Sequence, residues 1–360
     1  MVKKLHLGEI YSKIRACERI DKQEALHLFK NAPWLEVAQL AWECRQRKTD
    51  PKTASYTVFR IINYTNICSI ACSFCSFKCE QENRNAYVLT KEQIFELINQ
   101  AIPKGSSQVF FQGGVNPDLP LDYYLDILSG IKTTYGFHIR GFSPVEIKHM
   151  AETYQLEIPR LINLLKAAGL DSVPGAGAEI LSERVRKVLS PRKCTTSEWI
   201  DIMKECHKQG LYGSANIVIG SVETNEEIID HLDHVRSIQD ETGGFNSFIP
   251  WTFQAQTKDF PRKNIMHHDY LKLLGISRIY LDNINNIEVS VMVLGTEIGK
   301  LALRMGANDI SSPVLEEKVL RSFGVSSEED ARKLITAAGF VPVKRDFDYT
   351  LQTKKNPNSV

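Results

Sequence analysis

Residues 56–77 read YTVFRIINYTNICSIACSFCSF, a predicted strand that is followed at once by closely spaced cysteines. The first part of this stretch is rich in β-branched and aromatic residues, which favour a strand. Cys68, Cys72 and Cys75 then form the pattern C-x3-C-x2-C, with Phe74 just before the third cysteine. Three thiolates cannot complete a tetrahedral structural zinc site, which needs four protein ligands. They can hold three irons of a [4Fe–4S] cluster and leave the fourth iron open.

A further cysteine, Cys79, extends the run to C-x3-C-x2-C-x3-C. As a fourth ligand it would close the site, so a non-catalytic iron–sulfur or zinc protein is the alternative from another class of function. We interpret Cys79 as a nearby thiol that does not bind the cluster. Cys17, Cys44, Cys194 and Cys206 lie on predicted helices, and we interpret them as packing residues.

Length and composition allow a large core, because the chain has 360 residues of which 43% are hydrophobic. That suits one large α/β barrel or two ordinary domains. The net charge of +1 gives no reason to expect nucleic acid or an anionic membrane as a partner. The N-terminus, MVKKLHLGEI, has no apolar signal core, and no apolar run approaches the length of a membrane span. We expect a cytoplasmic protein, where cysteines stay reduced.

The first 50 residues are predicted to be helical, with a capping box at Asp21–Glu24 and a charged linker over Arg45–Lys52. Short apolar strands and helices then alternate, which is the pattern of a parallel sheet. The predicted strands are Tyr56–Asn63, Gln108–Gln112, His138–Phe142, Leu170–Val173, Gly213–Gly220, Phe245–Pro250 and Ile287–Val289. The alternation predicts an α/β fold, a (β/α)8 barrel of the TIM type.

Three segments follow from this interpretation. We predict an N-terminal helical layer over residues 1–50, the barrel over residues 51–310 and a short C-terminal extension over residues 311–360. The extension is predicted to contain a helix capped near Ser327 and a strand at GFVPV, and its last residues, KKNPNSV, are predicted to be disordered.

Distinctive residues follow the predicted strands, at the barrel face where such folds place their chemistry. Gly113 and Gly114 follow the second strand, Ser143 the third and Glu179 the fourth. Glycines let a backbone approach a ligand closely, although they also occur in ordinary turns. An acid at the start of a helix can equally interact with the helix dipole. Together with the cysteines, these residues predict one shared site.

The cysteine spacing and its aromatic residue resemble the cluster motif of the radical S-adenosylmethionine (radical SAM) enzymes. Longer stretches resemble the radical SAM menaquinone enzymes of the futalosine route: INYTNIC, GGVNPDLPLDYYLDIL, FSPVEI, AGLDSVPGAGAEIL, DETGGFNSFIPWTFQ and LALRMGANDI. The similarity runs from about Leu5 to Leu351. The segments FSP and PWTFQ resemble the cyclic dehypoxanthinyl futalosine synthase family more closely than the aminofutalosine synthase family. The FO synthase subunits of deazaflavin biosynthesis resemble the chain less than either family does.

The resemblance implies a [4Fe–4S] cluster on the three cysteines, with SAM on its open iron. It implies a SAM site that includes Phe74, Gln112, Gly113, Gly114, Ser143 and Glu179. It also implies a small, nucleoside-like substrate and a low-potential electron donor such as flavodoxin or ferredoxin. In the cyclase reaction the C4′ hydrogen of dehypoxanthine futalosine is removed, and the C4′ radical adds to the benzoate ring of the same molecule. The base for the last proton is not assigned.

The sequence departs from the family pattern at three places, and the last two, which we expect near the substrate pocket, leave the substrate open. Ala176 replaces the middle glycine of PGGGAEI, and Ser221 replaces the histidine of a Gly-His-Val-Glu-Thr segment. Ser311-Ser312-Pro313 stands where a glycine-rich continuation is expected. Aminofutalosine synthase, in which the adenosyl group stays in the product, and an FO synthase subunit therefore remain as alternatives.

Overall fold

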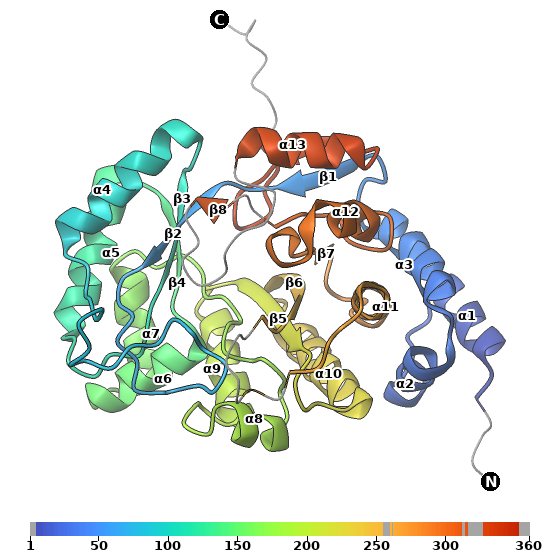
Figure 1. Ribbon diagram of the computed structural model, residues 1–360, viewed down its shortest axis with the longest axis horizontal. Helices are drawn as coiled ribbons and strands as arrows, with labels where there is room; N and C mark the ends of the chain where they lie inside the picture. Colours follow the sequence, from blue (N-terminus) through green and yellow to red (C-terminus); the bar gives the residue numbers. More distant parts are fainter. Residues whose placement is uncertain (1–4, 255–259, 261, 312–313, 316–326, 353–360) are drawn as a thin grey trace, which may run out of the picture.

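The protein is described by a computed structural model over residues 5–254, 260, 262–311, 314–315 and 327–352. Figure 1 shows helices arranged around an inner set of strands, with the N-terminal helices on one side of the molecule. Among the described residues, no helix is both long enough and apolar enough to cross a membrane. Ser312, Pro313 and the predicted disordered tail lie outside the described residues.

The N-terminal residues form α1 (Leu7–Arg15), α2 (Lys22–Asn31) and α3 (Trp34–Lys48). The capping box at Asp21 is confirmed, because its side chain accepts from the backbone of Glu24 while the Glu24 carboxylate bonds back. The prediction of a charged linker over Arg45–Lys52 is wrong, because α3 continues to Lys48. Arg45 is fully buried within α3, and its guanidinium donates to the carbonyls of Ala307 and Thr53, each at 2.7 Å. These partners are distant along the chain or lie beyond the helix, so a local charge pattern could not reveal them.

The strands are β1 (Thr53–Tyr56), β2 (Phe59–Asn63), β3 (Gln108–Gln112), β4 (His138–Gly141), β5 (Gly213–Ile219), β6 (Phe245–Thr252), β7 (Asn286–Ile287), β8 (Val314–Leu315) and β9 (Val341–Lys344). Strand β2 pairs in parallel with β3, and β3 with β4. In a second sheet, β5 pairs in parallel with β6, and β6 with β7. The predicted strand Leu170–Val173 is reduced to a single bridge from Ser172 to Arg140. Predicted strand Tyr56–Asn63 is split into β1 and β2.

Single-residue bridges and backbone hydrogen bonds join these sheets into a barrel. Ser172 pairs with Arg140 of β4, and the same segment reaches β5 where Gly175 donates to the carbonyl of Ser214 at 2.7 Å. On the other side, Asp309 forms parallel bridges to both Glu288 and Ser55. The chain therefore forms the closed parallel barrel that the alternation predicted. The segments at residues 172 and 309 take the place of two strands, each with bridges at a single residue.

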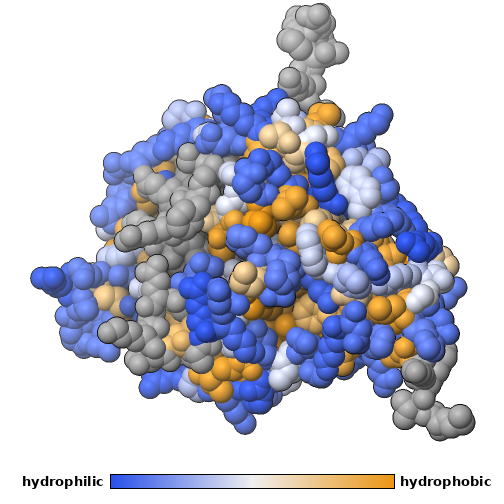
Figure 2. Space-filling model, turned by 45° about the vertical axis from the view of Figure 1, so that its right-hand side comes forward, coloured by the Kyte–Doolittle hydropathy of each residue, from blue (hydrophilic) through white to orange (hydrophobic). Residues whose placement is uncertain are grey.

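Helices on the outside cover the barrel: α4 (Lys91–Ala101), α5 (Leu121–Tyr135), α6 (Pro144–Thr153), α7 (Ile158–Ala167), α8 (Glu183–Leu189), α9 (Thr196–Lys208), α10 (Asn225–Thr242), α11 (His267–Tyr280), α12 (Val291–Leu303) and α13 (Glu328–Ala337). Capping boxes at Thr90, Thr195 and Thr224 begin α4, α9 and α10, as predicted. Helix α3 packs against α11, and α2 against α10. The outer surface in Figure 2 is mostly hydrophilic, with apolar side chains in separate areas.

The C-terminal segment closes the floor of the barrel, at the N-terminal ends of the strands. Strand β9 pairs in parallel with β1, and the backbone N–H of Phe347 donates to the side chain of Gln108 at 2.5 Å. Arg345 forms two hydrogen bonds to Asp309, at 2.5 and 3.0 Å, inside the barrel. The helix capped by Ser327 and the GFVPV strand are confirmed as α13 and β9. The domain boundaries at residues 50 and 310 stay predictions.

Candidate active site

The cysteine loop lies over the C-terminal end of the barrel and is held by backbone hydrogen bonds. Ser69 donates its N–H to the carbonyl of Val115 at 2.9 Å, and Ser73 donates to Leu189 at 3.0 Å. Ala71 has a positive φ of 54°, a conformation that is strained for alanine. The loop is thereby fixed to two neighbouring segments of the barrel mouth, although the residues between its cysteines form no helix or strand.

The thiols of this loop differ in exposure. Cys72 is buried, whereas Cys68 and Cys75 are half-buried, and none of them is in a disulfide. Burial raises the pKa of the Cys72 thiol to about 11, partly opposed by the positive charge of Lys193. A thiol in such surroundings needs a bound cation to become a thiolate ligand.

Glycines after β3 form a cradle for the loop. A Cβ on Gly114 would lie 2.1 Å from the carbonyl oxygen of Ile67, and one on Gly113 would lie 2.7 Å from the ring of Tyr64. Side chains here are therefore excluded by the loop and by the core beneath it. The structure gives these glycines a packing role, and their contact with SAM stays a prediction.

A buried carboxylate that the sequence analysis missed supports the same turn. Glu146 in α6 accepts hydrogen bonds from the Tyr64 hydroxyl at 2.8 Å and from the N–H of Gly113 at 3.3 Å. Its second oxygen accepts from the N–H and hydroxyl of Ser143, at 2.7 and 2.8 Å. Ser143 is thus the N-cap of α6, and its hydroxyl is bonded within the chain. The sequence Ser-Pro-Val-Glu is a capping box with proline at the first helical position, so this helix could have been predicted.

Glu179 lies on the loop after Ser172, with a positive φ of 42°. One carboxylate oxygen accepts from Lys193 at 2.8 Å, and the other has no partner among the described residues although it is buried. Burial alone would lower the pKa of Lys193, but the charges of Glu179 and Cys72 raise it. The Lys193 ammonium also lies 5.3 Å from the centre of the Phe74 ring. Lys193 therefore links the predicted SAM residue to the cysteine loop, a role that only its distant contacts reveal.

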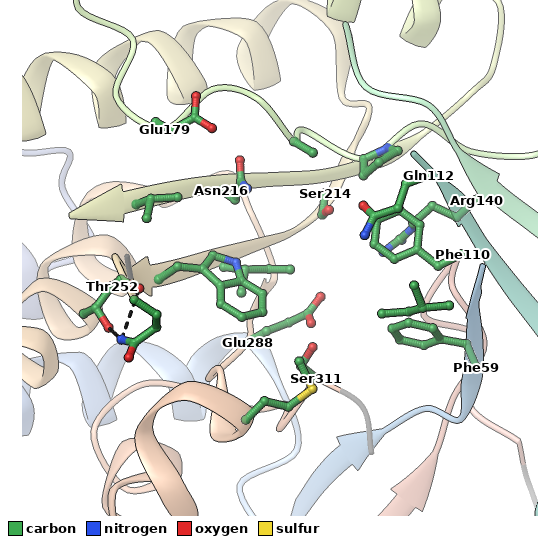
Figure 3. Close-up of a pocket in the computed structure, with 18 of the residues that line it drawn as sticks. Phe59, Phe110, Gln112, Arg140, Glu179, Ser214, Asn216, Thr252, Glu288 and Ser311 are labelled. Carbon is green, nitrogen blue, oxygen red and sulfur yellow. Dashed lines mark hydrogen bonds between the residues drawn. The ribbon is translucent and has the colours of Figure 1, made fainter. Parts of the chain in front are cut away.

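A cavity of about 320 Å³ runs from the cysteine loop down into the barrel. Its upper wall includes Phe74, Cys75 and Glu179, and lower down it is lined by alternate residues of the strands. These are Phe59 and Ile61 of β2, Phe110 and Gln112 of β3, Arg140 of β4, Ser214, Asn216 and Val218 of β5, and Ile249 and Trp251 of β6. Figure 3 shows Glu179 on one side of this space and Arg140, Phe110 and Gln112 together on the opposite side.

Of the predicted SAM residues, Phe74, Gln112 and Glu179 line the cavity together with Cys75, a predicted cluster ligand. The other three residues (Gly113, Gly114 and Ser143) are engaged in the turn and cap described above. Of the family departures, Ala176 and Ser311 line the cavity, whereas the Ser221 hydroxyl turns to Glu223 at 2.6 Å.

The residues present fit a cluster with SAM. Three free thiols lie on one anchored loop, and the unpartnered oxygen of Glu179 lies beside the same cavity. Among the described residues, no three His, Cys, Asp or Glu side chains converge on a single metal ion. A [4Fe–4S] cluster does not require this, because each thiolate binds a separate iron. The donor set therefore suits a cluster more than a single ion.

Comparison with known proteins gives the family. The sequence profile of the radical SAM superfamily matches residues 62–235, and that of the CofH/MqnC C-terminal region matches residues 242–358. The chain is 37% identical to cyclic dehypoxanthine futalosine synthase of Halalkalibacterium halodurans, over 93% of this chain and 92% of that protein. It is 36% identical to 5-amino-6-(D-ribitylamino)uracil–L-tyrosine 4-hydroxyphenyl transferase of Archaeoglobus fulgidus, over 88% of this chain and 93% of that protein.

Solved structures agree on the fold. Methylornithine synthase (PylB) has a TM-score of 0.70 at 16% identity, covering 92% of this chain and 97% of that chain. The maturase HydG from Carboxydothermus hydrogenoformans has a TM-score of 0.74 at 15% identity, covering 95% of this chain and 80% of that chain. At such identities the likeness shows the fold alone.

The chain therefore belongs to the radical SAM superfamily and, within it, to the family whose C-terminal region the CofH/MqnC profile describes. Its cofactors are a [4Fe–4S] cluster and SAM, and it is an enzyme that acts on a small molecule.

Proposed function

We propose that the chain converts dehypoxanthine futalosine to cyclic dehypoxanthine futalosine in menaquinone biosynthesis. The observation that carries this proposal is the placement of Trp251, Thr252, Phe253 and Gln254. This segment resembles the cyclase family, and it lines the same cavity as Cys75. The relatives from H. halodurans and from Streptomyces coelicolor, the latter 35% identical over 97% of this chain, support the same choice.

The proposed reaction forms one ring bond and removes two hydrogens from the substrate. The C4′–H bond of the ribose and one C–H bond of the benzoate ring are broken, and C4′ becomes bonded to the ring carbon. When bound to Cys68, Cys72 and Cys75, the cluster with SAM supplies the 5′-deoxyadenosyl radical that accepts the C4′ hydrogen. The second hydrogen leaves as a proton, and the remaining electron would pass to the cluster, which SAM cleavage leaves oxidised.

The chain's own residues contribute position and enclosure. Both reacting groups belong to one molecule, so the cavity must hold the ribose and the ring close together. Aromatic side chains from β2, β3 and β6 form its walls, and the C-terminal segment closes its floor through Phe347. Such walls keep water away from a radical and leave fewer competing hydrogen donors.

A low-potential electron donor such as flavodoxin or ferredoxin, and a cytoplasmic location, are part of this proposal. The half-buried thiols of Cys68 and Cys75 support the electron donor, because a cluster held there would lie near the surface of the barrel mouth, within reach of a partner protein.

A second candidate is favoured by one observation. The A. fulgidus transferase and a Methanococcoides burtonii protein of the same name are each 36% identical to this chain, which lies between the 37% and 35% of the two cyclases. In that case the substrates would be tyrosine and 5-amino-6-(D-ribitylamino)uracil. Aminofutalosine synthase is the alternative within the menaquinone route, and its product would keep the adenosyl group.

The test is anaerobic incubation of the reconstituted enzyme with SAM, dithionite and either substrate set, followed by mass spectrometry. The proposal predicts a product two hydrogens lighter than dehypoxanthine futalosine and no reaction with tyrosine. A tyrosine-derived adduct, or a product that contains adenine, would assign the chain to one of the alternatives.

A further inference from the structure

Arg140 lies at the closed end of the cavity, where the reaction described above assigns it no role. It is in β4, directly opposite Phe110 of β3 in the parallel register, and its side chain lines the cavity. Only 6% of the residue is exposed. Phe347 from the C-terminal segment stacks beneath it, with the guanidinium carbon 4.2 Å from the ring centre. The guanidinium is therefore packed against the floor of the barrel, and the Arg140 side chain points into the cavity (Figure 3).

This guanidinium has unused hydrogen-bond donors. Its Nη2 donates to the carbonyl of Phe347 at 3.3 Å, and its Nε–H has no acceptor among the described residues. No carboxylate within the described part of the chain lies within ion-pair distance of it. Arginine carries five N–H donors in a planar fork that matches a carboxylate. A buried charge without a partner is costly, so an anionic ligand here would offset that cost.

The neighbouring charges are one arginine and two carboxylates. Arg345 bonds twice to Asp309 and lies 3.5 Å from Glu288. Glu288 also accepts from the hydroxyls of Ser247 at 2.7 Å and Tyr349 at 2.6 Å. Its charge is thus held by donors in the floor and acts on Arg140 only from beyond ion-pair distance. Glu288 therefore balances the charge of Arg140 only at longer range, and the N–H donors of Arg140 remain available to a ligand.

The surroundings of Arg140 specify the rest of the ligand. Phe59, Phe110 and Phe347 line the same end of the cavity, and Phe59 lies 5.0 Å from Phe347 between ring centres. Such walls suit a flat aromatic ring. Further up, Asn216 Oδ1 and one oxygen of Glu179 are buried without donors among the described residues. Both accept hydrogen bonds, so the upper part of the ligands must supply hydroxyl or N–H groups.

We propose that Arg140 binds the carboxylate of an aromatic acid, so that the substrate enters with its carboxylated ring against the floor and its hydroxylated part toward the cysteine loop. The inference rests on the proposed function for the identity of that substrate, an aryl carboxylate joined to a sugar. It goes further by fixing the direction in which the substrate lies. It also makes Arg140 a specificity-determining residue.

The test uses pairs of ligands that differ only in the charged group. The probes are 3-ethylbenzoate and 3-ethylbenzamide, and dehypoxanthine futalosine with its carboxamide analogue. Dissociation constants are measured by anaerobic calorimetry on the full chain with its cluster and SAM. We expect the wild type to bind each carboxylate roughly 10- to 100-fold more tightly than the amide, as for hydrogen bonds to a charged group. In Arg140→Gln this ratio should fall to about one.

Controls separate the charge from the fold. Arg140→Lys keeps the charge without the fork, so it should retain part of the preference. Arg160→Gln makes the same change at an exposed arginine of α7 that does not line the cavity, and it should keep the wild-type ratio. If Arg140→Gln does not fold, the wild-type preference and the partial preference of Arg140→Lys still decide the matter. Equal binding of acid and amide by the wild type, or an unchanged ratio in folded Arg140→Gln, would overturn the inference.

The outcome is separate from that of the proposed function. If the benzoate preference depends on Arg140 but dehypoxanthine futalosine is not converted, the carboxylate site stands and the cyclase assignment fails. If the enzyme converts dehypoxanthine futalosine while Arg140→Gln leaves the preference intact, the reverse holds.

Discussion

Gly114 and Ile67 are in backbone contact, with the space for a Gly114 side chain occupied by the Ile67 carbonyl oxygen at 2.1 Å from an ideal Cβ. The same hypothetical atom would lie 3.1 Å from the Cβ of Cys68. The end of β3 and Cys68, the first of the predicted cluster ligands, are therefore packed without an intervening side chain. Any residue larger than glycine must move the loop that carries the ligands.

Gly114→Ala should therefore impair cluster assembly while the barrel stays folded. The added methyl group displaces Ile67 and Cys68, whereas the core beneath is unchanged. Iron content and cluster absorbance after anaerobic reconstitution measure the effect, and circular dichroism checks the fold. Gly8→Ala is the matched control, because nothing lies within 4 Å of its Cβ in α1 and the change should be neutral or stabilise by up to about 1 kcal/mol. A fully loaded Gly114→Ala would show that the contact does not matter.

Single replacements of Cys68, Cys72 or Cys75 by alanine should give folded protein that neither holds a competent cluster nor cleaves SAM. Each thiolate binds its own iron, and the barrel core does not depend on the loop. Cys79→Ala is the control. Its backbone pairs with Asn66 and Cys68, but we expect its thiol to be a bystander, so iron content and activity should persist. Iron loss in Cys79→Ala would revive the four-ligand alternative.

Glu179→Gln should weaken SAM binding more than cluster assembly, by roughly tenfold if one charge-assisted hydrogen bond is lost. The unpartnered oxygen of Glu179 lines the cavity, while its other oxygen position can still accept from Lys193. Equilibrium binding of SAM to reconstituted protein measures this. Glu329→Gln on the exposed face of α13, 74% exposed at the side chain, should leave SAM affinity unchanged. Equal affinity in both variants would remove Glu179 from the SAM site.

Acid should lower the free energy of unfolding through the buried His231. Burial lowers the pKa of His231 from 6.5 to about 3, and its Nδ1 accepts from the backbone N–H of Leu181, which requires the neutral ring. The unfolded chain therefore binds more protons, so stability is complete above pH 6.5 and declines as the pH falls toward 3. The slope for one such group is about 1.4 kcal/mol per pH unit. Urea unfolding of wild type and His231→Gln between pH 7 and 5 tests this, and parallel slopes would refute it.

The sequence predicted the parts of the fold that depend on local pattern. Short apolar runs such as Gln108–Gln112 became strands, and boxes such as Thr90–Gln93 began helices where expected. The signal that begins α6, at Ser143–Glu146, was present but was interpreted only as part of a strand-end motif. Residues 170–173 were predicted as a full strand, yet only Ser172 forms a bridge.

Contacts between distant segments could not be predicted. Arg45 and Arg345 are charged residues whose burial depends on carbonyls and carboxylates from other parts of the barrel. Lys193 and Arg140 belong to the cavity only because the loop and strands come together around it. The cysteine spacing could be read from the sequence because it is contained within a few residues, and the assignment of these cysteines to the cluster stays a prediction.

The most direct test of the account is the fate of the C4′ hydrogen. Reconstituted enzyme is incubated anaerobically with SAM, a reductant and dehypoxanthine futalosine deuterated at C4′, and the 5′-deoxyadenosine formed is analysed by mass spectrometry. The account predicts one 5′-deoxyadenosine per cyclic product, each carrying one deuterium. Unlabelled 5′-deoxyadenosine, or a product that has retained the adenosyl group, would contradict it.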